Sequence, residues 1–301
     1  MSRPELETTE LRNPTRIERG AVRIVAKGDD AYPAALRDLP NPPHELFILG
    51  ALETLAPPVV AVVGTRNATD YGLRVTRELC RSLARAGACV VSGLARGVDA
   101  AAHRATLAEN GRTAAVLGTG VDVPYPVGHR ELHGIIARRG LLLSEFLPGS
   151  KAAKGSFPRR NRILAALASV TIVVEAPRES GALNTAGVAL MLGRTVASVP
   201  GPIDSPQSVG TNELLRDGAT VIASVEDALA LVGLTAPPRS AHPTFGEAEM
   251  LVLKVLRRAP TDLDSLAART RLPARECMRA VTTLELAGAV ECLLTGEIRR
   301  R

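Results

Sequence analysis

The sequence predicts an α/β protein with a Rossmann-like, doubly wound, mostly parallel sheet and a small C-terminal winged-helix domain. Three observations lead to this fold class. Between Val59 and Ile222, short β-branched apolar runs alternate with longer amphipathic stretches, which is typical of a parallel sheet with helices on both faces. The runs are almost wholly apolar, as expected for strands covered on both sides. After Pro243 the pattern changes to short helical segments and a final hairpin.

The expected strands and helices alternate through the main part of the chain. The strands are Val59–Val63, Ala88–Val91, Thr113–Leu117, Leu141–Leu143, Val170–Val174, Thr195–Val199 and Thr220–Ile222. The helices between them are Gly72–Ala86, Val98–Glu109, Arg130–Arg139, Ile163–Ala168, Ala182–Leu192 and Asn212–Arg216. The proline-punctuated stretch Tyr32–Gly50 comes before them and is expected to be a packed lead-in, after a loose polar arm.

A proline-containing linker, Thr235–Pro243, separates this region from a tail with its own pattern. Helices are expected at Glu247–Arg258, Asp264–Thr270 and Pro273–Ala287, with a hairpin over Val290–Leu294 and Ile298, which is typical of a winged helix-turn-helix. The predicted boundaries are residues 1–50 for the arm and lead-in, 51–234 for the Rossmann-like domain, 235–243 for the linker and 244–301 for the winged helix.

Composition argues against several classes of protein. The chain has 301 residues, 46% of them hydrophobic, which is enough for one large core and a small second domain. No apolar run reaches membrane-spanning length, and the polar, acidic start is unlike a signal peptide. The four cysteines contain no close-spaced pair, so neither a zinc site nor a disulfide framework is expected, and a reducing cytoplasm fits. The net charge of +6 favours an anionic partner.

Three predicted loops have the character of an anion site. They are Gly64–Asn67, Ser92–Asp99 and Glu175–Gly181, each directly after a predicted strand. Ligands of doubly wound sheets bind at the carboxyl ends of the strands, where helix N-termini direct free N–H groups outward. Glycines allow backbone amides to approach a phosphate, and the guanidinium groups of Arg66 and Arg96 can clamp its oxygens. A glycine alone indicates only a tight turn, but the combination predicts a phosphate-binding surface.

A basic run, Lys151–Arg162, adds a second indication. It holds five basic residues and no acidic one, with Phe157 in its middle. Arginines beside an aromatic ring offer phosphate pairing together with base stacking. A run of this kind on its own is more often a solvated surface, but here two arginine-bearing loops are expected to converge on it. Aromatic residues make up only 2% of the chain, so a stacking platform has to use Tyr71, Tyr125 or Phe157.

No familiar cofactor, metal or nucleophile motif is complete. The first strand is not followed by G-x-G-x-x-G, and a Walker A sequence is absent, so no NAD or ATP cofactor is expected. His129 and His133 are spaced i, i+4, but the glutamate of the zinc-protease pattern is missing, so no metal is expected. Ser92 is not in a hydrolase elbow. Glu145 and Glu175 each end a strand and suit either an acid/base pair or, as we favour, partners of loop amides and arginines.

Several separated motifs resemble one family. In order, they are Val63–Arg66, Ser92–Asp99, Tyr125-Pro126, Ser144-Glu145, Phe157–Ile163, Val174–Ala176, Ser180–Leu183 and Gly193-Arg194. They resemble the DNA-processing protein A family, DprA or Smf, over roughly Tyr32 to Leu231, and the tail resembles the winged helix that many members carry. The resemblance implies a protein that binds and protects single-stranded DNA, forms a homodimer and helps to load the RecA recombinase in natural transformation, without catalytic turnover.

The resemblance also assigns roles to residues. Arg66 and the Ser92–Gly97 loop are expected at the DNA pocket, Phe157 matches the family's stacking aromatic, and Lys154 matches a basic contact position. Arg162 is expected to be partly structural. His129 departs from the asparagine common in the family, and the N-terminal region is shorter than in many members. With the loops above, the candidate nucleic-acid-binding residues are Gly64, Thr65, Arg66, Ser92, Gly93, Arg96, Gly97, Lys154, Phe157, Arg160, Asn161, Arg162, Ser180 and Gly181.

Two other classes of function compete with this interpretation. A nucleotide-monophosphate phosphoribohydrolase has a similar phosphate-binding architecture, but its P-G-G-x-G-T-x-x-E stretch is replaced here by Pro177–Leu183. A winged-helix transcription regulator would sense a nucleotide with its core and read an operator with its tail. The tail, residues 243–301, holds ten basic and eight acidic residues, a net charge of +2, which favours a protein contact over a grip on duplex DNA.

Overall fold

The computed structural model describes residues 22–235, 245–256, 260–286, 288–293 and 296–300. The predicted arm up to residue 21, the linker from residue 236 onward and the predicted element ends Arg258, Ala287 and Leu294 lie outside the described residues. Residue contacts divide the chain into two compact units, residues 1–237 and 238–301. Each unit is described by itself.

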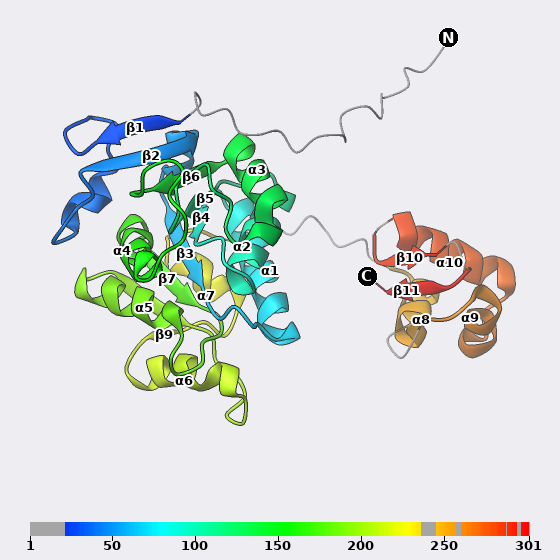
Figure 1. The fold of residues 1–301 in the computed structure, drawn as a ribbon. Helices are drawn as coiled ribbons and strands as arrows, with labels where there is room; N and C mark the ends of the chain where they lie inside the picture. Colours follow the sequence, from blue (N-terminus) through cyan, green and yellow to red (C-terminus); the bar gives the residue numbers. More distant parts are fainter. Residues whose placement is uncertain (1–21, 236–244, 257–259, 287, 294–295, 301) are drawn as a thin grey trace, which may run out of the picture. The chain divides into compact units, whose positions relative to one another are not determined.

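The first unit is built on a nine-stranded sheet with the order β1-β2-β6-β5-β4-β3-β7-β8-β9 (Figure 1). The strands are β1 (Arg23–Ala26), β2 (Glu45–Gly50), β3 (Val59–Val63), β4 (Cys89–Ser92), β5 (Thr113–Val116), β6 (Leu141–Ser144), β7 (Val170–Val173), β8 (Thr195–Ser198) and β9 (Thr220–Val221). All neighbouring pairs from β6 to β9 are parallel. Successive strands run outward from β3 in both directions, so the predicted doubly wound fold is confirmed.

Two antiparallel strands extend the sheet beyond the predicted parallel core. Strand β2 pairs with β6 and β1 pairs with β2, both antiparallel. The sequence indicated only a packed lead-in over Tyr32–Gly50, because its prolines interrupt the periodicity on which strand prediction depends. Those prolines precede β2, whose central residues Leu46 to Leu49 are buried. The lead-in therefore supplies β2. The expectation of a loose arm up to about residue 30 was wrong for Arg23–Ala26, which pairs with β2 as the edge strand of the sheet.

Helices cover both faces of the sheet, with α1, α2 and α3 on one side and α4 and α5 on the other (Figure 1). The helices are α1 (Asp70–Arg85), α2 (Val98–Ala108), α3 (Arg130–Arg139), α4 (Ser156–Leu167), α5 (Gly181–Met191), α6 (Val209–Arg216) and α7 (Val225–Ala230). Alternate side chains of β3 enter opposite cores: Ala61 packs with the α4 side and Val62 with the α1 side. Burial of both faces explains why the strand sequence is apolar throughout.

Helix α4 begins seven residues before the predicted start at Ile163. Gly155, with a left-handed φ of 86°, precedes the first turn, and Pro158 lies within that turn. Proline is tolerated there because the first N–H groups of a helix have no intrahelical partner. The apolar periodicity begins only at Ile163, because the buried residues before it, Ser156, Arg160 and Asn161, are polar. The early start places Phe157 at a helix N-terminus.

The second unit has the predicted winged-helix elements. These are α8 (Glu247–Leu256), α9 (Leu263–Thr270), α10 (Ala274–Leu286) and the antiparallel strands β10 (Val290–Cys292) and β11 (Ile298–Arg300). Its core joins residues of all three helices, such as Val252, Leu266 and Leu284, to Val290 and Ile298 of the hairpin. The amphipathic spacing in the tail therefore predicted the packing of this unit correctly.

Neither a membrane span nor a disulfide is found in the part of the chain that the structure describes. No helix there is both long and apolar enough to cross a bilayer. Cys80, Cys89 and Cys277 are buried as free thiols, and Cys292 is exposed and free. Burial raises the pKa of the Cys89 thiol to about 12, so this group is inert at neutral pH.

Truncation of the winged-helix core is expected to loosen the second unit selectively. Leu284 is fully buried in α10, whereas Met278 on the same helix is 55% exposed. Leu284→Ala should cost about 2–5 kcal/mol because it leaves a cavity, whereas Met278→Ala should cost no more than about 0.5 kcal/mol. Hydrogen exchange should show faster exchange across α8, α9 and α10 in the first variant alone. Equal protection in both variants would contradict the packing described.

Candidate nucleic-acid interface

The three predicted loops meet at the carboxyl ends of β3, β4 and β7, which are neighbours in the sheet. The Thr65 amide donates to the Glu175 carbonyl oxygen over 2.7 Å, which joins the first loop to the third. The Val98 amide donates to the Thr65 carbonyl oxygen over 3.3 Å, which joins the second loop to the first. Strand order reverses around β3, and such a switch point is where doubly wound sheets bind their ligands. The predicted convergence of the loops is therefore found.

Close backbone approach explains two of the predicted glycines. Gly97 has a φ of 72°, and a Cβ atom there would lie 2.3 Å from the Thr65 carbonyl oxygen. A Cβ atom on Gly64 would lie 2.5 Å from a Val98 methyl carbon. Only glycine fits at either position without movement of the loops.

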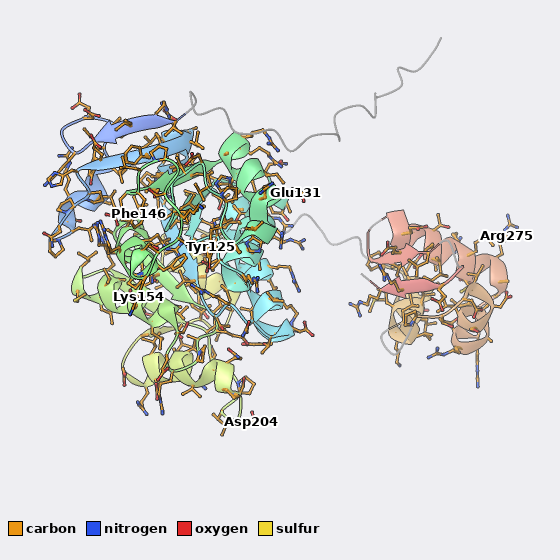
Figure 2. All side chains as sticks on the ribbon, in the orientation of Figure 1. Tyr125, Glu131, Phe146, Lys154, Asp204 and Arg275 are labelled. Atoms are coloured by element: carbon orange, nitrogen blue, oxygen red, sulfur yellow. The ribbon has the colours of Figure 1, made fainter. Side chains whose placement is uncertain are left out.

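An aromatic and cationic cluster lies beside these loops. The Arg66 guanidinium carbon lies 5.3 Å from the centroid of the Phe157 ring, and the Tyr125 ring centroid lies 5.4 Å from the same ring at a tilt of 38°. Tyr125 is 42% exposed. In Figure 2, Tyr125 projects over the middle of the first unit, and Lys154 lies over α4. We call Arg66, Tyr125 and Phe157 the stacking cluster.

Three predicted cations at this edge are free to meet an anion. The side chains of Arg66, Arg96 and Lys154 are exposed. Within the described residues, none of them has a hydrogen bond or an ion pair. Helices α2 and α4 also begin here, at Val98 and Ser156, and their N-terminal amides add partial positive charge. The arrangement provides phosphate-binding groups beside a surface on which a base can stack.

Arg160, which the sequence grouped with the binding residues, is buried. Its side chain is only 5% exposed, and its Nη1 donates to the Val116 carbonyl oxygen over 2.6 Å. Its Nε donates to Asn161 Oδ1 over 3.1 Å. A Cβ atom on Gly93 would lie 1.8 Å from Nη1, so the guanidinium group occupies the space that this glycine leaves. Arg160 therefore connects α4 to β5 and β4 instead of facing solvent.

The Asp99 side chain binds the backbone of the second loop, Ser92–Asp99. One of its carboxylate oxygens accepts hydrogen bonds from the amides of Gly93 at 3.1 Å and Ala95 at 3.3 Å. Burial raises the pKa of Asp99, while the positive charge of Arg160 and these amides oppose the shift. Asp99 therefore braces its own loop, and Arg160 supplies the opposite charge that burial of a carboxylate requires.

Other predicted site residues have partners within the protein. Ser92 donates to the Val62 carbonyl oxygen at 2.7 Å, and the Ser180 hydroxyl accepts from the Ala182 amide at 3.3 Å as the cap of α5. Asn161 donates to the Gly181 carbonyl oxygen at 3.1 Å, which joins α4 to α5. These contacts position the loops.

The glutamates that end strands also have partners within the protein. Glu145 forms ion pairs with Arg159 and Arg162. Arg162 donates in addition to the Asn41 carbonyl oxygen at 2.7 Å, so its predicted structural part is present. Glu175 accepts the Thr69 amide at 2.9 Å at the start of α1. The interpretation of these glutamates as partners of amides and arginines is therefore confirmed.

His103, His129 and His133 lie in different local environments. His133 is fully buried, and its pKa is lowered to about 4 by burial. His129 contacts the Leu94 carbonyl oxygen through Nδ1 at 3.0 Å. His103 is buried with its Nδ1 2.8 Å from the Thr113 hydroxyl. Among the described residues, no group of three or more histidine, cysteine, aspartate or glutamate side chains is placed to hold a metal ion.

Sequence reasoning left Tyr125 out of the candidate site. Tyr125 was one of three rings considered for stacking, but nothing in the sequence placed it beside Phe157. The structure brings these two rings together and leaves Tyr71 elsewhere, with its hydroxyl donating to the Pro200 carbonyl oxygen. Gly118 leaves room for the Phe157 ring, because a Cβ atom there would lie 2.9 Å from it, and no sequence pattern encodes this contact.

Fold and site together define a Rossmann-like protein with a cationic, aromatic surface at the switch point of its sheet. The family model described as DNA recombination-mediator protein A matches residues 23–233, and the model of the DprA winged helix domain matches residues 235–293. The chain therefore belongs to the DNA recombination-mediator protein A family, as the motifs predicted.

Relatives of known name agree with this assignment. A putative DNA processing protein DprA of Mycobacterium tuberculosis is 40% identical over 90% of this chain and 75% of its own, and protein Smf of Escherichia coli is 35% identical over 92% and 77%. The structure of DprA from Streptococcus pneumoniae has a TM-score of 0.68 and 39% identity, covering 71% of this chain and 75% of that one. DprA from Helicobacter pylori, reported for its single-stranded DNA binding mode, has a TM-score of 0.63 and 34% identity, covering 68% and 93%.

The close approach at Gly97 is expected to make this glycine more costly to replace than Gly87. Both have positive φ, but a Cβ atom on Gly87 meets nothing within 4 Å. Each alanine substitution costs about 1–2 kcal/mol of backbone strain, and Gly97→Ala adds a clash with the Thr65 carbonyl. The measurement is the free energy of unfolding from urea titration. Equal losses in the two variants would show that the loops do not touch as described.

Proposed function

We propose that the protein binds single-stranded DNA, with one base stacked on the cluster of Arg66, Tyr125 and Phe157. The observation that carries the proposal is this cluster: two neighbouring aromatic rings and a guanidinium group next to glycine-bearing loops and two helix N-termini. Bases in a duplex are already stacked on one another, so a platform of this kind favours an unpaired strand. Any base has a π-face, so the binding is sequence-tolerant.

The exposed cations supply the electrostatic part of the affinity. Arg66, Arg96 and Lys154 lie on separate elements around the cluster, where they can pair with successive phosphates. The residues proposed to contact DNA are therefore these three cations and the two rings, while the loop amides of Thr65, Gly93 and Ala95 are bound within the protein. Arg160, Asn161, Ser92 and Ser180 hold those groups in place. Phosphate pairing makes the affinity fall steeply with salt.

Family membership and the Helicobacter pylori relative support the same ligand. On that basis we further propose that the protein protects incoming single-stranded DNA, acts as a homodimer and helps to load RecA in natural transformation and recombination. In a homodimer, the two DNA-binding pockets could bind the same strand, which would raise the apparent affinity. We propose a cytoplasmic location, which free cysteines suit.

We also propose that the protein is not an enzyme. In support, the two glutamates at the strand ends have internal partners: Glu145 pairs with arginines and Glu175 accepts loop hydrogen bonds. A phosphoribohydrolase would need a carboxylate that is available to the substrate. Incubation with AMP is expected to release no adenine, and sustained release would overturn this proposal.

Removal of the Phe157 ring is expected to weaken single-strand binding. Phe157→Ala should lower the affinity for an oligothymidylate by about 1–3 kcal/mol, the value of one stacked base. Phe146→Ala is the matched control, because Phe146 also packs against an arginine, Arg159 at 5.2 Å, but lies outside the cluster (Figure 2). Gel shifts at a fixed salt concentration measure the affinity of both variants for the single strand. The same measurement with a duplex of equal length shows whether the protein prefers single-stranded DNA. Equal affinities of both variants for the single strand would remove the cluster from the interface.

The RecA proposal has its own test. RecA is mixed with single-stranded DNA that is already coated by a single-strand-binding protein, and the lag before RecA hydrolyses ATP is followed. Addition of this protein should shorten the lag, and Phe157→Ala should shorten it less. A lag that the protein leaves unchanged would contradict the role in loading, and light scattering that gives the mass of one chain would contradict the homodimer.

A further inference from the structure

A groove between α1 and α2 extends from the stacking cluster and is lined by basic side chains. Its volume is about 460 Å³, and Arg66, Arg77, Arg81, Arg104 and His129 are among its lining residues. Every fully charged side chain in the lining is cationic. A concave surface with one sign of charge concentrates counter-ions of the opposite sign, so the groove suits a polyanion.

The arginines of the groove are mostly unpaired. Arg77 and Arg104 are exposed, and within the residues that the structure describes neither has a hydrogen bond or an ion pair. Arg81 lies 3.7 Å from Glu109, but that carboxylate also binds Arg85 at the shorter distance of 2.8 Å. Arg77 and Arg81 are four residues apart on α1, which separates them by about 6 Å along the helix axis. Two cations at this spacing match successive phosphates of an extended strand.

Small side chains from α2 leave room between the arginines. Ala101, Ala105 and Ala108 contribute to the lining on that side. Alanine gives no side chain that would fill the space and offers nothing that reads a base. The α2 side of the groove therefore provides room beside the arginine charges, which suits a sugar-phosphate backbone.

The groove is continuous with the site described above. Arg66 lines the groove and also lies over the Phe157 ring, and Gly97 lines it from the second loop. His129, which also lines it, is fixed by its contact with Leu94 of that loop. A strand with one base on the stacking cluster would thus pass Arg66 directly into the groove.

We propose that the α1–α2 groove binds the backbone of the single-stranded segment adjoining the nucleotide on the stacking cluster. The inference rests on the proposed function, because it concerns the same strand. It assigns Arg77 and Arg104 as phosphate-binding residues and predicts a site that is longer than the cluster. Binding energy from the groove is then available only to strands long enough to reach it.

The test compares a short and a long oligothymidylate, of about 3 and about 20 nucleotides, which lie below and above the usual site size of one binding fold, about 4–16 nucleotides. Affinity is measured by fluorescence anisotropy over a series of salt concentrations for the full chain and the double variant Arg77→Ala/Arg104→Ala. For the long strand, the slope of log K against log salt should fall in magnitude by about 1.4, at about 0.7 for each phosphate that the variant no longer neutralises. For the short strand the slope should stay unchanged.

A control variant separates the groove from a general loss of charge. Arg23→Ala/Arg216→Ala removes two exposed arginines from β1 and from the end of α6, outside the groove. It should leave both slopes unchanged. The groove proposal would be overturned if the groove variant left the salt slope for the long strand unchanged. It would also be overturned if the control variant lowered that slope by the same amount.

Phe157→Ala separates the two proposals. If Phe157→Ala lowers the affinity for both strands while the groove variant binds like the unmodified protein, the stacking cluster is supported and the groove inference fails. If Phe157→Ala leaves both strands unaffected, the proposed function fails instead, whatever the groove variant does. Loss of affinity for both lengths in the groove variant would also contradict an adjoining segment, since the short strand does not need to reach it.

Discussion

The guanidinium group of Arg160, buried beneath the carboxyl edge of the sheet, is the constraint on which the site depends. It binds the carbonyl oxygen of Val116 and the side chain of Asn161, and its charge offsets that of the buried Asp99. Burial of an unpaired cation or carboxylate is costly, so the arrangement is stable only when β5, α2 and α4 are all in place. The first turn of α4, with Phe157, is fixed as a consequence. Arg160 and Asp99 are buried and do not face solvent, yet they set the position of the Phe157 ring, which we propose contacts the DNA.

This arrangement separates two tasks among residues of one chemical kind. Arg160 and Arg162 are tied to internal carbonyl and carboxylate oxygens, whereas Arg66 and Arg96 are exposed and unpaired within the described residues. The internal arginines give rigid loops, and the exposed ones leave their charge available to phosphates. We propose that a binding surface built in this way holds a backbone and stacks a base without reading its identity.

Much of the fold followed from the sequence because burial leaves a strong pattern. Strand β3 and helix α3 were predicted at their observed ends, since a doubly covered strand and an amphipathic helix both show in the order of apolar residues. The sheet edge was missed, because the prolines before β2 obscure its pattern. The convergence of the three loops was predicted correctly, but charge alone did not show that the Arg160 side chain is buried. That orientation depends on Gly93 and Asp99 of a distant loop, and no local pattern encodes the contact.

Photocrosslinking tests most directly whether a base lies on the stacking cluster. A single-stranded oligonucleotide that carries 5-iodouracil is irradiated with the full chain, and the modified residues are identified by mass spectrometry. The predicted crosslinks are at Phe157 and Tyr125, whose ring centroids lie 5.4 Å apart at the switch point of the sheet. Crosslinks confined to other rings, such as Phe146 or Tyr71, or to the winged-helix unit would contradict a binding site at this edge.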